Sequence, residues 1–233
     1  MRNVAKTPEI LDLLEAHYGA QEPSWPVDPY LYLVWLYCGY PASDAACARG
    51  WKSLTKKIGV SPKHLLTASN RALARALRPG GLVPGLRAIR LKEMAARVTN
   101  EFAGDLRAGL TGPLAQVRKA LKKFPTIADP GADRILLFAG IAPIAAVPSN
   151  CPHVLIRIQR GRERKNYAVN YREAQEAIGA EVPENLEARA RAYLLLKRHG
   201  QEFCKRTKPR CEQCPIRTYC AFFEGKGRGR AIL

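Results

Sequence analysis

Residues 204–220 read CKRTKPRCEQCPIRTYC and decide how the rest of the chain is interpreted. They hold Cys204, Cys211, Cys214 and Cys220, which are four of the seven cysteines in the sequence. Four clustered thiols predict a metal site, either structural zinc or a [4Fe–4S] cube. Zinc sites usually join two short Cys-x₂₋₄-Cys pairs, whereas this loop has one such pair with a single cysteine on each side. The spacing therefore favours the [4Fe–4S] cluster, and zinc is the alternative.

The charge of the chain indicates a polyanionic partner. Its 233 residues include 38 Lys+Arg and 20 Asp+Glu, which gives a net charge of +18, and 47% of them are hydrophobic. This composition predicts a folded protein that binds nucleic acid. An excess of charge that serves only solubility is the alternative. The last 83 residues hold 18 of the basic residues against nine acids.

The hydrophobic pattern predicts neither a membrane span nor an export signal. The most apolar stretch, residues 135–147, is interrupted by Gly140 and Pro143. The first residues lack the apolar segment of a signal peptide. We therefore expect no membrane partner and a cytoplasmic protein that associates with the nucleoid when it binds DNA.

The chain outside the cysteine loop has a helical pattern. Apolar residues recur at intervals of three and four rather than in the alternation typical of strands. Helices are expected over 8–18, through Tyr37, and over 44–57, 62–67, 69–77, 86–103, 114–124, 132–139 and 184–199, the last one with Gly200 as its C-cap. The helices at 114–124 and 132–139 form a pair joined by a tight turn. We predict an all-α protein.

The cysteine loop resembles that of endonuclease III and its relative, the adenine glycosylase. Residues 124–132, FPTIADPGA, resemble the hairpin L-P-G-V-G-R-K-T-A, whose amides bind a phosphate in that family. Residues 147–157, VPSNCPHVLIR, are similar to V-D-T-H/S-N-x-x-R-V-x-x-R, and residues 28–44 to P-F-x-L-L…L-S-A-Q-A-T-D. The resemblance spans about residues 25–220. It implies a two-lobed helix–hairpin–helix DNA glycosylase fold with an iron–sulfur cluster loop.

The resemblance also implies how the chain is divided and where DNA binds. A helical-barrel lobe with the hairpin is expected at 24–140, and a cluster lobe at 1–23 plus 141–233. Damaged double-stranded DNA is expected to bind a monomer across the cleft between the lobes. The alternative is that the basic residues of the cysteine loop only keep that loop solvated and do not contact DNA. The residues expected at DNA are Thr126, Ile127, Ala128, Ser149, Asn150, Arg157, Arg160, Arg162, Arg164, Lys205, Arg206, Lys208 and Arg210.

Three prolines depart from the family pattern. Pro130 stands at the position of the catalytic lysine, Pro148 at that of the catalytic aspartate, and Pro41 at that of a glutamine that probes the opposite strand. A proline can neither attack a sugar carbon nor accept a proton, so no β-lyase activity is expected. In the hairpin, Thr126 and Ala128 replace glycines, which predicts a looser phosphate contact.

Base excision still needs a group that stabilises a positively charged sugar. Asp44, Asp129, Asp133 and His153 are the candidate catalytic residues. The alternatives are helix N-caps for Asp44 and Asp129, a solvated helix residue for Asp133, and a hydrogen-bonded structural residue for His153.

Two functions remain open at this point. One is a monofunctional DNA N-glycosylase of base excision repair. The other is a non-catalytic DNA-binding [4Fe–4S] protein, either a lesion sensor or a redox-responsive factor. A carboxylate kept at the pocket favours the enzyme, and a pocket filled by proline favours the binder.

Overall fold

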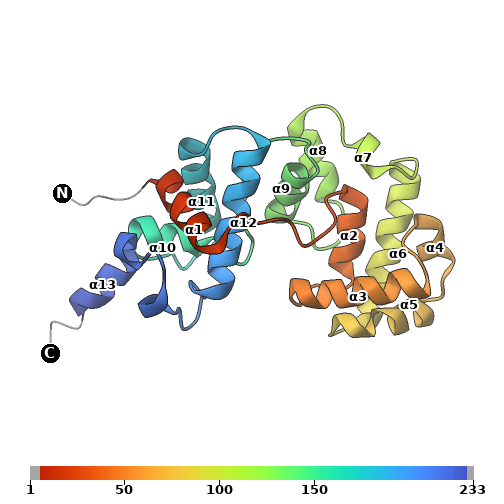
Figure 1. Ribbon diagram of the computed structural model, residues 1–233. Helices are drawn as coiled ribbons and strands as arrows, with labels where there is room; N and C mark the ends of the chain where they lie inside the picture. Colours follow the sequence, from red (N-terminus) through yellow and green to blue (C-terminus); the bar gives the residue numbers. More distant parts are fainter. Residues whose placement is uncertain (1–5, 230–233) are drawn as a thin grey trace. The chain divides into compact units, whose positions relative to one another are not determined.

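The computed structural model describes residues 6–229, and every regular element in this range is a helix (Figure 1). The all-α prediction is confirmed. The α-helices are α1 (Thr7–Tyr18), α2 (Pro29–Tyr37), α3 (Asp44–Lys57), α4 (Pro62–Thr67), α5 (Asn70–Leu77), α6 (Pro84–Glu101), α7 (Leu106–Gly109), α8 (Leu114–Leu121), α9 (Asp129–Phe138), α10 (His153–Arg160), α11 (Tyr167–Glu181), α12 (Leu186–Glu202) and α13 (Ala221–Gly229). Short 3₁₀ turns are η1 (Arg78–Gly80), η2 (Cys211–Gln213) and η3 (Arg217–Tyr219).

The chain divides into two compact units. Unit 1 comprises Met1–Glu22 and Ala142–Leu233, and unit 2 comprises Pro23–Ile141. Unit 2 carries 18 Lys and Arg against 7 Asp and Glu, whereas unit 1 carries 20 against 13. The excess of positive charge is therefore larger in unit 2, although the cluster loop belongs to unit 1. Within residues 6–229, no helix has the length and apolar character needed to cross a membrane.

Unit 2 is built around α2, which packs against α3, α6, α7 and α9. Asp28 caps this helix by accepting a hydrogen bond from the Leu31 amide at 2.9 Å, and Pro29 occupies its first position. Leu33, Val34 and Trp35 are buried on successive faces because neighbours surround the helix. Fully burying side chains of this size stabilises the fold by roughly 1.5–3 kcal/mol each.

Arg87 is fully buried in unit 2 and joins several of its elements. Its guanidinium donates to the carbonyl of Cys38 and, at 2.8–3.0 Å, to those of Leu77, Gly81 and Leu82. The Cys38 carbonyl also lies against two glycines, since a Cβ atom would come within 2.1 Å of it at Gly50 and 1.8 Å at Gly80. Four backbone acceptors thus replace the carboxylate that usually accompanies a buried cation.

Unit 1 packs α1 against α11 and α12, and packs α10 against α11, α12 and α13. Its core includes Ile10, Leu14, Val154, Ile178 and Leu195. The sequence analysis did not identify α10 or α11 as helices. Both contribute to this core, and α10 also supports the cysteine loop.

Gly200 is not a C-cap, so that prediction is wrong. Helix α12 continues to Glu202, and Gly200 is buried inside it. A Cβ atom at this position would lie 2.4 Å from the sulfur of Cys151. The glycine is therefore required by a close approach between α12 and the segment before α10, and not by the end of the helix.

Candidate functional site

The four cysteines of the loop line one hollow in unit 1, with a volume of about 340 Å³ that includes space open to solvent. The rest of its wall is mainly apolar and consists of Ile158, His199, Phe203, Pro209, Ile216, Arg217, Phe222 and Phe223. Residues 6–229 contain no group of three or more His, Cys, Asp or Glu side chains gathered as ligands of a metal ion. The four thiols that share this hollow equal in number the cysteine ligands that a [4Fe–4S] cube takes.

Short turns bring the cysteines to this hollow. The Cys214 amide donates to the Cys211 carbonyl at 3.2 Å in η2, and the Cys220 amide donates to the Arg217 carbonyl at 3.2 Å in η3. Burial raises the pKa of Cys204 to about 12 and that of Cys214 to about 11. Arg157 acts in the opposite direction on Cys204. Thiolates at this site need further positive charge, which the iron of a cluster would provide.

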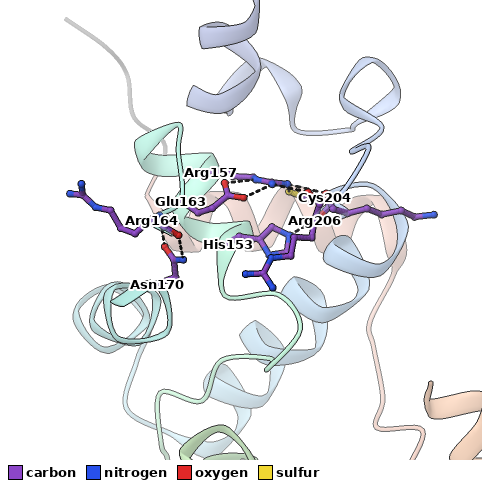
Figure 2. A network of polar contacts seen from close by, with 8 residues as sticks. His153, Arg157, Glu163, Arg164, Asn170, Cys204 and Arg206 are labelled. Atoms are coloured by element: carbon purple, nitrogen blue, oxygen red, sulfur yellow. Dashed lines mark hydrogen bonds and ion pairs between the residues drawn. The ribbon is translucent and has the colours of Figure 1, made fainter. Parts of the chain in front are cut away.

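Arg157 holds the start of the loop, as Figure 2 shows. Its guanidinium donates to the carbonyls of Lys205 at 2.9 Å and Arg206 at 3.1 Å, and lies 4.0 Å from the sulfur of Cys204. It also forms a bidentate ion pair with Glu163. Partial burial raises the pKa of Glu163, but hydrogen bonds from Arg157 and the backbone outweigh it, and the net pKa lies below the ordinary value.

These contacts correct one DNA-binding prediction. The side chain of Arg157 is buried and already holds four acceptors, so it does not belong to the surface cations. Glu163 was missed because nothing in the sequence pairs it with Arg157. An acid just after a helix is usually solvated.

His153 lies beside Arg157 at the start of α10, and its Nε2 is 2.8 Å from the Cys204 carbonyl (Figure 2). Its side chain is buried, and this burial lowers the pKa of the imidazole. A neutral ring with its Nε2 hydrogen donated to the backbone has no proton-accepting nitrogen at the surface. His153 is therefore placed as a hydrogen-bonded structural residue and not as a catalytic base.

The other cations of the predicted DNA surface differ in exposure. Arg160 is exposed and pairs with Glu173 at 2.8 Å. Arg164 is exposed, and its backbone is fixed by Asn170, which accepts from its amide at 2.8 Å and donates to its carbonyl at 2.7 Å. Lys205 is half-buried, whereas the exposed members of the set are Arg162, Arg206, Lys208 and Arg210.

Ser149 and Asn150 are both exposed in the segment before α10. The Ser149 hydroxyl donates to Asn150 Oδ1 at 2.9 Å, and the Tyr167 hydroxyl donates to the Ser149 carbonyl at 3.1 Å. Pro148, which precedes them, is buried. The resemblance places a catalytic aspartate at this position, and in the structure the position is buried.

The hairpin between α8 and α9 is a tight turn. The Ile127 amide donates to the Phe124 carbonyl at 3.1 Å, and the Ile127 side chain is buried. Thr126 has φ +65°, the left-handed conformation that glycine normally adopts, whereas Ala128 has an extended backbone with φ −105°. Both of these side chains are exposed. Threonine thus reproduces the one backbone angle in the turn that calls for glycine.

Comparison with known proteins identifies this architecture. No family model matches the chain. A solved endonuclease III–DNA complex covers 96% of this chain and 99% of its own, with a TM-score of 0.73 and 19% identity. The chain has the endonuclease III fold. The structure of a thermostable thymine-DNA glycosylase matches with a TM-score of 0.71 at 19% identity, covering 94% of this chain and 97% of that one.

A relative by sequence is also described as a glycosylase. The thymine/uracil-DNA glycosylase of Pyrobaculum aerophilum is 24% identical over 169 residues, which cover 72% of this chain and 70% of that protein. The fold that the resemblance to endonuclease III implied is confirmed by the two structural matches.

Within the endonuclease III fold, two of the acidic candidates hold partners at the hairpin. Asp133 is fully buried and forms an ion pair with Arg118, so it is not a solvated helix residue. Asp129 is exposed and lies 2.7 Å from the Lys122 ammonium. It is the first residue of α9 and not its N-cap, which is Ala128.

Asp44 is the third acidic candidate, and it is half-buried at the first position of α3. The N-cap is Ser43, whose hydroxyl accepts from the Ala46 amide at 3.4 Å, so the N-cap interpretation of Asp44 is wrong. Burial raises the pKa of Tyr32, and the nearby Asp44 carboxylate adds to that rise. Asp44 therefore lies close to the buried aromatic cluster of unit 2 that contains Tyr32, Trp25 and Trp35.

Proposed function

We propose that this protein is a DNA repair glycosylase of the endonuclease III type. It would bind damaged double-stranded DNA as a monomer and release a base by hydrolysis of the N-glycosidic bond. The observation that carries the proposal is the endonuclease III fold over 96% of the chain. The net charge of +18 and the thymine- and uracil-directed glycosylases among the similar proteins support it.

We also propose that Cys204, Cys211, Cys214 and Cys220 hold a [4Fe–4S] cluster. The cube would supply a compact redox-active centre that ties both ends of a polar loop together. Arg157 and His153 hold the backbone where the loop begins, through the carbonyls of Cys204, Lys205 and Arg206. The exposed Arg206, Lys208 and Arg210 then stand on a fixed loop and would contact phosphates without reading bases.

In the proposed reaction, a carboxylate stabilises the positive charge that develops on the sugar as the base leaves. Asp44 is the candidate that is partly buried and is not the cap of its helix. Lys122 and Lys123, the lysines nearest to Pro130 along the chain, are paired with Asp129 and Glu101. Since Pro130 cannot form a Schiff base, the strand would remain intact after excision.

The test is an excision assay on a panel of damaged duplexes, beginning with uracil or thymine paired with guanine because of the proteins matched above. We expect abasic sites without strand cleavage, and no covalent adduct with abasic DNA after borohydride treatment. A trapped adduct would show that a lysine reaches the sugar and would refute the hydrolytic mechanism.

A specific observation favours a second function, a non-catalytic lesion binder. The resemblance places a catalytic aspartate at position 148, where this chain has a buried proline and therefore no carboxylate. The same panel separates the two functions. Preferential binding of a damaged duplex without release of any base would support the binder and refute the glycosylase.

Salt dependence tests the phosphate contacts in either case. If about five to eight phosphates are neutralised, log Kd plotted against log salt should have a slope with magnitude on the order of 5–7. An affinity that does not change with salt would contradict a phosphate-dominated interface.

A further inference from the structure

A buried histidine outside the cysteine set points at one of the cysteines. His199 lies on α12 and lines the same hollow as the four sulfurs, and its side chain is 1% exposed. Its Nε2 is 3.7 Å from the sulfur of Cys214, within the range of a hydrogen bond to sulfur. On the other side of the ring, its Nδ1 is 3.1 Å from the hydroxyl of Tyr18 on α1.

The ring has no freedom to turn away. Phe203 stacks on it with a centroid separation of 6.0 Å and an interplanar angle of 25°, and Tyr18 meets it edge-on at 6.3 Å. A neutral imidazole carries one hydrogen on one of its two nitrogens and accepts at the other. Which nitrogen carries it depends on the two neighbours.

A bound cluster selects one arrangement of that hydrogen. A cysteine that ligates iron is a thiolate and has no hydrogen to donate, so it can only accept. Nε2 must then carry the hydrogen and donate it to Cys214, while Nδ1 accepts from the Tyr18 hydroxyl. Tyr18, His199 and Cys214 thus form a directed chain of two hydrogen bonds that ends on a cluster ligand.

We propose that His199, oriented by Tyr18, raises the reduction potential of the [4Fe–4S] cluster through a hydrogen bond to the sulfur of Cys214. This inference rests on the cluster proposed above. An N–H donor stabilises the more negative, reduced form of a cluster more than the oxidised form, and hydrogen bonds to sulfur are among the factors that set such potentials. The hydrogen stays on Nε2 in both forms, so one electron is exchanged with the electrode and no proton moves.

The experiment measures the reduction potential of the holoprotein by voltammetry, with iron and sulfide content determined for every variant. His199→Leu removes the donor and keeps a similar apolar volume, whereas His199→Gln offers an amide N–H in its place. The leucine variant should show a lower potential, and the glutamine variant should recover part of the difference. The expected change is about tenfold in the oxidised-to-reduced ratio at a fixed potential, which for one electron corresponds to about 59 mV.

Ile158→Val is the matched control, because Ile158 lines the same hollow and carries no donor. Equal potentials for the wild type and His199→Leu, or an equal fall in Ile158→Val, would overturn the proposal. If His199→Leu loses its cluster, Tyr18→Phe decides, since it keeps the ring and removes only the hydroxyl. A fall in its potential supports the chain of hydrogen bonds, and an unchanged potential refutes it. Wild-type protein without iron and sulfide would instead refute the cluster itself.

Discussion

The cysteine loop of unit 1 and the hairpin of unit 2 keep different parts of the endonuclease III pattern. The loop has all four cysteines, and α10 holds its backbone through Arg157 and His153. The hairpin has Thr126 and Ala128 where the pattern has glycines, yet it still makes its turn, because Thr126 adopts φ +65°. A site made of side chains depends on residue identity, whereas a site made of backbone amides depends on conformation. The loop should therefore tolerate substitution much less than the hairpin does.

The largest effect is expected at the cysteines. Cys204→Ala should abolish the yellow-brown colour and reduce iron and sulfide from about four each per chain to near zero. The matched control is Cys47→Ala, which changes a buried thiol in unit 2 and should keep full iron content. If Cys204→Ala kept its iron, the loop would not be the more demanding of the two regions.

The next effect tests whether unit 2, in addition to its hairpin, contributes a catalytic carboxylate. Asp44→Asn keeps the shape of the side chain and removes its charge, so it should lower turnover by about a hundredfold or more. Binding of an abasic-site duplex should persist. Asp129→Asn, which changes an exposed carboxylate paired with Lys122, should leave turnover within about threefold. The reverse order in single-turnover rates would move the role to Asp129.

The support that α10 gives to the loop should be measurable as a contribution to the free energy of unfolding. Arg157→Met removes the ion pair and the two bonds to the loop carbonyls, and we expect a loss of about 3 kcal/mol together with faster release of iron. Arg162→Met, at an exposed position five residues later, should change stability by no more than about 0.5 kcal/mol. Denaturant unfolding and iron release to a chelator test both variants. Equal stability of the two would mean that the loop needs no support from Arg157.

The smallest effect compares the two hairpin positions at which the family pattern has glycine. The Thr126→Gly variant should be more stable than the Thr126→Ala variant by up to about 1 kcal/mol, because glycine adopts a positive φ without strain. Ala128→Gly should instead destabilise the protein by about 0.5–1 kcal/mol, since the backbone at Ala128 is extended and glycine only adds freedom to the unfolded chain. Effects of the same sign at both positions, measured by thermal unfolding, would show that the conformation of Thr126 carries no strain.

Much of the fold could be predicted from the sequence because its signals are local. The helix predicted at 44–57 matches α3, and the pair around the hairpin follows the Leu and Ile stripes of α8 and α9. Helix α10 was missed although His153, Arg157 and Arg160 recur at helical intervals, because a helix of eight residues offers little periodicity to detect. Helix α11 was not predicted either, although Tyr171, Ala174 and Ile178 form an apolar stripe at helical spacing that could have revealed it.

The site was less predictable because its contacts join distant parts of the chain. Arg157 meets Lys205 and Arg206 across almost fifty residues, and no pattern around position 157 distinguishes a buried arginine from a surface one. Gly200 looked like the end of a helix, but the residue is a glycine because the sulfur of Cys151, almost fifty residues earlier in the chain, lies directly against it. Side-chain chemistry can be read locally, whereas burial depends on the packing of the whole unit.

The buried Arg87 and the two glycines around the Cys38 carbonyl have a consequence for mutational scanning. Any side chain at Gly50 or Gly80 would collide with that carbonyl, and shorter or uncharged replacements of Arg87 would abandon several acceptors at once. In a selection for repair activity, we expect to recover only the original residue at each of these three positions. They would stand out as strongly as the cysteines, although their intolerance reports the geometry of one carbonyl and not a role in excision.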